Sequence, residues 1–130
     1  MNSDDLKRRT KKFSLDILDL VTEMPKTIKG RIIAMQLGRC ATSVGANYRA
    51  ACRSRSKPEF IAKVGTVIEE SDENAFWMEL TIESRTLPEP RVAVLLKEAD
   101  ELTAIMTSSR KTAQASLNRK SEINNDFAHR

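Results

Sequence analysis

The sequence predicts an all-α protein, an antiparallel up-down-up-down bundle of four helices. Apolar side chains recur every three or four residues along four long segments, which is the spacing of one helix face. The breaks between segments are short and lie near Pro25, Arg55 and Pro88, and short connections favour antiparallel neighbours. No Asn-Gly hairpin and no sustained alternation of apolar residues indicates a strand.

The first two helices are expected over about residues 4–24 and 27–53. The first begins with acidic residues, which the helix dipole favours, and Pro25 ends it because the residue before a proline avoids helical angles. The second contains Gly38 and Gly45 in its interior, where each glycine costs about 1 kcal/mol. Small residues there predict a neighbouring helix at close range.

The third helix is expected to begin at a capping box, in which Ser56 and Glu59 satisfy each other's backbone donors. The fourth has a similar start, Thr86-Leu87-Pro88-Glu89. Its apolar pattern ends near residue 115. We therefore expect a four-helix domain over residues 1–115 and a polar, disordered tail over residues 116–130.

Polar and aromatic residues interrupt the expected apolar stripes. The stripe of the second helix is expected to consist of Ile33, Leu37, Cys40, Val44, Asn47 and Ala51. A buried polar residue can fix register and oligomeric state, so Asn47 is a structural candidate. Phe76 and Trp77 are adjacent and cannot both face one seam, which indicates either self-association through a second apolar face or ordinary packing on the fourth helix.

Charge is strongly segregated along the chain, although the whole chain carries only +4. Residues 26–63 carry a net charge of +8, and residues 64–101 carry −7. The basic segment has four cations close together around one helix end: Arg49, Arg53, Arg55 and Lys57. Concentrated positive potential is what phosphate binding requires, so these residues are candidates to bind RNA or DNA. Neutralisation of the acidic third helix, within a subunit or between subunits, is the competing interpretation.

One ion pair between the second and third helices can be predicted from their connection. Antiparallel pairing about a turn near residue 55 places Arg39 opposite about Asp72. We therefore expect Arg39 to reach Asp72 or Glu73, with Glu69 as a lesser alternative.

The sequence indicates no catalytic, metal or cofactor site. The only histidine is His129, in the expected tail, so a metal site or a nucleophile–base pair cannot be built around it. Cys40 and Cys52 are about 18 Å apart if they share one helix, too far for a disulfide. No secretory signal or membrane span is recognisable, and we expect a cytoplasmic protein without a membrane partner.

The stretch RCATSVGAN at 39–47, followed by RSKPEF at 55–60, resembles the four-helix-bundle proteins encoded in intervening sequences of bacterial 23S ribosomal RNA genes. That family reads R-x-A-x-S-[IV]-x-x-N-I-A-E-G and then R-x-S-x-x-E-F. The matching residues are Arg39, Ala41, Ser43, Val44, Asn47, Arg55 or Arg53, Ser56, Glu59 and Phe60, and Glu73 falls where the family often has a glutamate. The chain departs from the motif after Asn47, where YRAA replaces IAEG.

The resemblance spans about residues 5–115 and implies a bundle that assembles as a homopentamer, without catalytic residues. It also implies similarity to the accessory variability determinant proteins of diversity-generating retroelements, which bind nucleic acid and a reverse transcriptase. Two functions follow as hypotheses. One is a nucleic-acid-binding oligomer, and the other is a structural or protein-interaction module, such as an accessory subunit of a reverse transcriptase complex.

Overall fold

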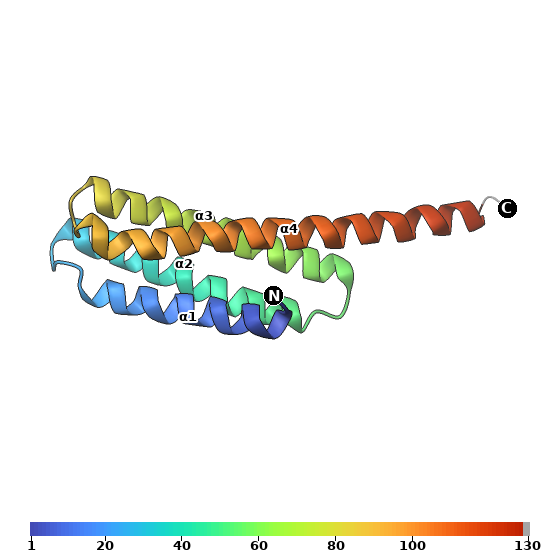
Figure 1. Ribbon diagram of the computed structural model, residues 1–130, viewed down its shortest axis with the longest axis horizontal. Coiled ribbons are helices and arrows are strands. Elements are labelled where there is room, and N and C mark those ends of the chain that lie inside the picture. Colours follow the sequence, from blue (N-terminus) through green and yellow to red (C-terminus); the bar gives the residue numbers. More distant parts are fainter. Residues whose placement is uncertain (129–130) are drawn as a thin grey trace.

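The computed structural model describes residues 1–128, which form α1 (Ser3–Thr22), α2 (Ile28–Cys52), α3 (Lys57–Glu83) and α4 (Glu89–Ala128). Within that range there is no strand, so the all-α prediction is confirmed. Figure 1 shows the chain turning back at each of its three connections, with consecutive helices side by side. The first two helices begin and end within two residues of the predicted bounds.

Side chains just ahead of α2 and α3 cap these helices. The Thr27 hydroxyl accepts a hydrogen bond from the N–H of Gly30 at 3.0 Å. Ser56, the predicted cap of α3, accepts from the N–H of Glu59 at 3.2 Å. The carboxylate of Glu59 accepts from the N–H of Arg55, at 3.2 Å, and not from that of Ser56. The expected capping box is therefore half formed, since Ser56 caps the helix and Glu59 binds the N–H of the preceding residue.

The connection from α3 to α4 turns through a left-handed residue, Arg85, whose φ is 57°. The N–H of Thr86 donates to the carbonyl oxygen of Thr81 at 3.0 Å, which closes the end of α3 in a Schellman-type turn. The sequence suggested that α4 starts at Thr86. The hydroxyl of Thr86 instead pairs with that of Ser84, at 2.7 Å. The fourth helix begins three residues later, at Glu89.

The buried stripes of α1 and α4 have the apolar spacing of three and four residues on which the prediction of helices rests. In α1 they are Leu6, Thr10, Phe13, Ile17, Leu20 and Met24, the last just past the helix end, and in α4 they are Val92, Leu95, Ala99, Leu102 and Met106. Each has less than a tenth of its surface exposed. Burial at this spacing is the main stabilising contribution to such a bundle.

Five of the six predicted stripe positions of α2 are buried, and Asn47 is the exception. Tyr48 is buried with 3% of its surface exposed, while Asn47 is only half-buried. In α3, Val67 is buried and Ile68 is half-buried, and the amide of Asn74 is fully buried and donates to a main-chain carbonyl of α2 at 3.1 Å. These departures are local, because Ala51 in α2 and Met78 in α3, which lie beyond them, are buried.

The small residues of α2 receive α1 at close range. A Cβ atom placed on Gly45 would lie 2.7 Å from the hydroxyl oxygen of Ser14. That hydroxyl donates to the main-chain carbonyl of Ala41 at 2.6 Å, so it bridges the two helices. The predicted close approach is confirmed, and α1 is the neighbour.

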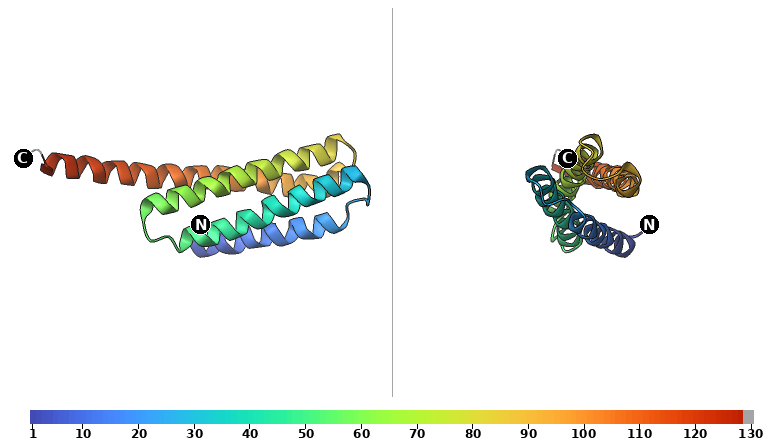
Figure 2. Two further views of the ribbon diagram at one scale, coloured as in Figure 1. Left: turned by 180° about the vertical axis from the view of Figure 1, so that it is seen from behind. Right: turned by 90° about the vertical axis from the view of Figure 1, so that its left-hand side faces the viewer.

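The helices α1 and α4 pack against each other much less than the sequence-adjacent pairs do. Figure 2 shows them end on, at the side where the bundle is least closed. Two sets of ion pairs join them. Arg9 binds Glu98 and Glu101 with N–O distances of 2.6 and 2.7 Å, and Arg91 binds Glu23 nearer the other end of α1.

The fourth helix continues to Ala128 and projects past the other helices (Figure 1). Residues 116–128 thus belong to α4, where the sequence predicted a polar, disordered tail. The physical reason is that no proline or glycine follows Pro90, so nothing ends the helix. His129 lies outside the described residues. No described helix, α4 included, has the length and apolar character needed to cross a membrane.

Candidate nucleic-acid interface

The outward face of α2 changes character along the helix. Its exposed residues at helical spacing are Ile28, Ile32, Met35, Arg39, Thr42, Ala46, Arg49 and Arg53. The first three are apolar, the central ones are small or polar apart from Arg39, and the last part is basic. The basic part lies beside the start of α3 and the start of α1, because the chain reverses at each connection (Figure 1).

A hollow of about 630 Å³ lies between α2 and α3, and we call it the α2–α3 hollow. Its lining consists of Ala46, Arg49, Ala50, Arg53, Arg55, Glu59 and Lys63. Three of the four predicted phosphate-binding residues therefore surround one depression. Lys63 from α3 adds a fourth cation to the hollow, and Glu59 is the single acidic residue in the lining of the hollow.

A second hollow, of about 280 Å³, lies between α1 and α2. This α1–α2 hollow is lined by Lys7, Lys11, Ser14, Thr42, Gly45, Ala46 and Arg49. It shares Ala46 and Arg49 with the α2–α3 hollow, so the two adjoin across α2. Sequence reasoning missed Lys7 and Lys11 because their segment has no net charge, although their spacing of four places them on one helix face.

The cations of the α2–α3 hollow are not neutralised within the described part of the chain. Arg49, Arg53, Arg55 and Lys63 take part in none of the ion pairs found there. The carboxylate of Glu59 is held instead by the main-chain N–H of Arg55. The hollow therefore combines four positive charges with one negative charge, which favours an anionic ligand.

Lys57, the fourth predicted binding residue, lies apart from the other three. Its ammonium group donates to the hydroxyl of Ser116 at 2.7 Å. Together with Phe60 and Arg119 it lines a different groove, of about 530 Å³, between α3 and α4. The turn after Ser56 directs Lys57 toward α4, which sequence proximity to Arg55 does not reveal.

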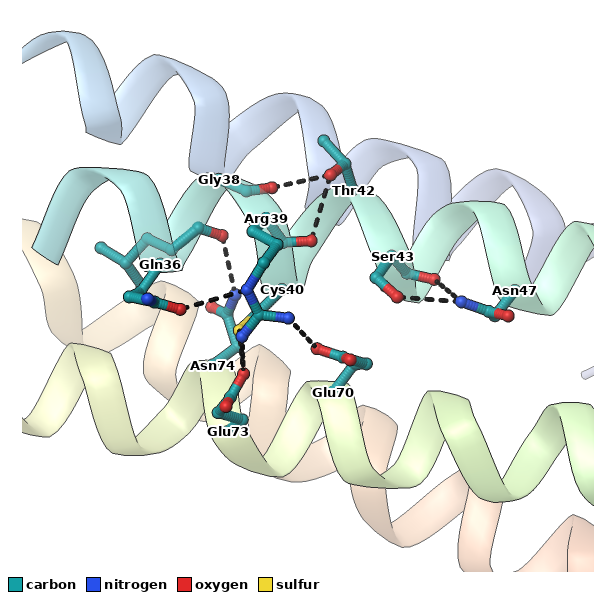
Figure 3. A network of polar contacts seen from close by, with 11 residues as sticks. Gln36, Gly38, Arg39, Cys40, Thr42, Ser43, Asn47, Glu70, Glu73 and Asn74 are labelled. Carbon is teal, nitrogen blue, oxygen red and sulfur yellow. Dashed lines mark hydrogen bonds and ion pairs between the residues drawn. The ribbon is translucent and has the colours of Figure 1, made fainter. Parts of the chain in front are cut away.

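Arg39 links α2 to α3 in the network shown in Figure 3. Its guanidinium pairs with the carboxylate of Glu73, which confirms one of the predicted contacts. It also reaches Glu70 at 3.3 Å, a partner that the sequence did not suggest. Asp72 is exposed and takes no part, because it lies on the outward side of α3. The pair is half-exposed, so its role is to align the two helices more than to add stability.

The thiol of Cys40 belongs to the same network and donates to Glu73. Burial, together with the neighbouring carboxylate, raises the pKa of Cys40. The thiol hydrogen bond and the Arg39 guanidinium lower the pKa of Glu73. Ligand atoms of Cys40, Glu70 and Glu73 lie within 4.8 Å of one another, as a metal site requires. However, the guanidinium already supplies the positive charge, and a thiol with a raised pKa is a poor source of thiolate. The cluster is an ion-pair network.

Asn47 hydrogen-bonds within its own helix. Its side-chain amide donates to both the carbonyl oxygen and the hydroxyl of Ser43, each at 2.9 Å (Figure 3). It forms no hydrogen bond to another helix in the described residues. The buried amide that joins two helices is that of Asn74, which the apolar pattern of α3 concealed.

The outward face of α3 is acidic with one aromatic residue. From residue 68 onward, the exposed residues of α3 are Glu69, Asp72, Phe76, Glu79 and Glu83. Phe76 is 50% exposed and meets Trp77 edge to face, with ring centroids 5.4 Å apart. Trp77 packs against the core, so Phe76 is the one of this pair that lies on a second surface.

Comparison with known proteins gives the chain a family. The model of the 23S rRNA-intervening sequence proteins matches residues 4–108. The chain belongs to this family. A solved structure from Bacteroides thetaiotaomicron, described as a protein of unknown function from the S23 ribosomal protein family, is similar with a TM-score of 0.79. The two are 25% identical, and the match covers 85% of this chain and 99% of that one. No protein with a curated description matches the chain.

In this member of the 23S rRNA-intervening sequence family, several of the recognisable motif residues have structural roles. Arg39 joins α2 to α3, Ser43 accepts from Asn47, and Ser56 caps α3. The motif therefore describes the α2–α3 hairpin. The motif also contributes Arg55 or Arg53 and Glu59 to the α2–α3 hollow, whereas Arg49 and Lys63 lie outside it.

Proposed function

We propose that this antiparallel bundle is a non-enzymatic homo-oligomer, a homopentamer, that binds the phosphate backbone of RNA or DNA. The observation that carries the proposal is the α2–α3 hollow, where Arg49, Arg53, Arg55 and Lys63 surround one depression with a single acid. Arginine and lysine contacts to phosphates supply most of the affinity of non-specific nucleic-acid binding. Lys57 lies on another groove and takes no part in this surface.

Oligomerisation is proposed because large apolar side chains remain exposed outside the core. They include Leu15, Leu18, Ile28, Ile32, Met35 and Phe76. Exposed apolar patches of this kind are typical of interaction surfaces. A ring of five subunits repeats the basic hollow five times, and the resemblance to ring-forming bundles supports that number.

The test measures assembly and RNA affinity in the same samples. Arg49→Ala/Arg53→Ala is expected to weaken binding of a single-sequence RNA by about tenfold or more at 0.1 M salt, since two phosphate contacts are removed. Oligomer mass by light scattering should be unchanged. A matched control, Lys26→Ala/Lys97→Ala, removes two exposed cations far from the hollow and should bind as the wild type does.

Two results would contradict a role of Arg49 and Arg53 in RNA binding. One would assign them to subunit assembly, and the other would leave them without either role. The first is a double variant that dissociates into monomers. The second is a variant with wild-type affinity and an intact oligomer. A monomer mass for the wild-type protein at micromolar concentration would remove the oligomeric part of the proposal.

A protein-interaction module is the second candidate, in the form of an accessory subunit of a retroelement reverse transcriptase complex. The apolar half of the outward face of α2, formed by Ile28, Ile32 and Met35, favours it. Ile32→Glu/Met35→Glu should abolish capture of a purified reverse transcriptase after nuclease treatment. If nuclease alone abolishes the capture, the contact runs through nucleic acid.

A further inference from the structure

The two basic hollows lie on opposite flanks of one helix. On one flank α1 contributes Lys7 and Lys11, which we call the α1 bank. On the other, Arg55 and Lys63 form the α3 bank. Arg49 on α2 borders both hollows and therefore lies between the banks.

The banks are separated by the width of a helix. α1 and α3 each pack against α2 and do not pack against each other. Packed helices have axes about 8–10 Å apart, so the axes of α1 and α3 are up to about 16–20 Å apart. Lysine and arginine side chains can lean inward from either flank. The two phosphate chains that border a groove of a nucleic-acid duplex are separated by a comparable distance, about 12 Å for the major groove of B-DNA.

The part of α2 between the banks carries small residues and no exposed aromatic side chain. Ala46 and Ala50 line the α2–α3 hollow, and Ala46 is exposed on the outward face. Neither hollow has an aromatic residue in its lining, and the tyrosine of this stretch, Tyr48, is buried with 3% exposed. Proteins that hold single strands stack the bases on aromatic rings, and this surface offers none.

We propose that this surface binds double-stranded nucleic acid, with the α1 bank on one phosphate chain and the α3 bank on the other. Arg49 and the small residues of α2 then face the groove between the chains. The inference rests on the proposed function and narrows its ligand from any phosphate backbone to a duplex. A single strand presents one chain of phosphates and engages one bank at a time.

The experiment compares three ligands of one sequence: a 20-base-pair RNA duplex, the corresponding DNA duplex and one RNA strand without self-complementarity. The full chain should bind at least one duplex about tenfold more tightly than the single strand at 0.1 M salt, because a duplex makes roughly two further phosphate contacts. The preferred duplex identifies whether an A-form or a B-form groove fits.

The α1 bank provides the decisive variant. Lys7→Ala/Lys11→Ala alters two exposed residues and should weaken duplex binding about tenfold. The slope of the logarithm of the duplex binding constant against the logarithm of the salt concentration should fall in magnitude by about 2. Binding of the single strand should change little. Lys26→Ala/Lys97→Ala serves again as the control with two fewer charges.

The outcomes separate this inference from the function on which it rests. Single-strand binding as tight as duplex binding, or equal losses for both ligands in Lys7→Ala/Lys11→Ala, overturns the duplex inference while phosphate binding stands. Absence of salt-dependent binding to all three ligands overturns both.

Discussion

The guanidinium of Arg9 on α1 donates to both carboxylate oxygens of Glu98 on α4, at 2.8 and 2.6 Å. It also donates to Glu101 at 2.7 Å. About three quarters of each side chain in the Arg9–Glu98 pair is covered, since 22% and 26% are exposed. Water therefore screens this ion pair less than it screens an ordinary surface pair. The Arg9–Glu98 pair also joins α1 to α4, the two neighbouring helices that pack together least.

Replacing Arg9 by alanine should lower the free energy of unfolding by about 1–2 kcal/mol, because two carboxylates lose their shared partner. Amide hydrogen exchange should speed up in α1 more than in α3. The control is Arg8→Ala, which breaks a pair with Asp5 on the exposed surface of the same helix and should cost less than about 0.5 kcal/mol. Equal losses in the two variants would contradict this assignment.

Glu73 should make the stability of the α2–α3 pair depend on pH. Its pKa is lowered in the folded state by the Cys40 thiol and by Arg39, so its contribution is complete above the ordinary glutamate value of 4.5. The contribution is lost as the pH falls through the lowered pKa. Urea unfolding at pH 7 should therefore show Glu73→Gln less stable than the wild type, and the gap should narrow at pH 3. The same narrowing for Glu79→Gln, an exposed acid of α3, would speak against the network.

Gly45 should tolerate no side chain. Gly45→Val places methyl groups where Ser14 already lies within 2.7 Å of a Cβ position, and we expect a loss of about 1–3 kcal/mol. Gly65→Ala is the matched control. Its new Cβ would meet only the Arg110 side chain, at 3.7 Å, so a gain of about 0.5–1 kcal/mol is expected from the lower entropy of the unfolded chain. Thermal unfolding of the two variants should shift in opposite directions.

Arg85→Gly should stabilise the protein by about 1 kcal/mol, because glycine adopts the left-handed conformation without the steric cost of a Cβ. Arg85→Ala controls for loss of the charged side chain and should give no such gain. Denaturant midpoints compare the three proteins directly. If alanine stabilises as much as glycine, the backbone conformation is not the cause.

The fold was predictable where apolar residues keep to a single face, as they do along α1 and along α4 as far as Met106. In α2, Asn47 was placed in the core where Tyr48 belongs, and the buried amide of Asn74 in α3 was not predicted. Only contacts in three dimensions distinguish two adjacent positions at the border of a stripe. Residues 116–128 contain no proline or glycine, and α4 continues through them although the apolar pattern has ended.

The candidate site was predictable in part, from charge density along α2. Arg49, Arg53 and Arg55 do surround one hollow, since helical spacing and a short turn fix their relation. Lys57 differs because the first turn of α3 rotates it toward α4. Lys7 and Lys11 are remote along the chain and come into the site only through the packing of α1 on α2.

All the extensive helix contacts of this protein join helices that are consecutive in the chain, and α1 with α4 is the weak exception. Such a topology has low contact order, which is associated with folding in microseconds to milliseconds. During synthesis the α1–α2 hairpin is complete before α4 exists, so each new helix finds its principal partner already in place as it leaves the ribosome. A nascent chain of this kind exposes each apolar stripe only until the next helix arrives. We expect α1, whose one extensive contact is with α2, to detach before α2 and α3 when the bundle opens.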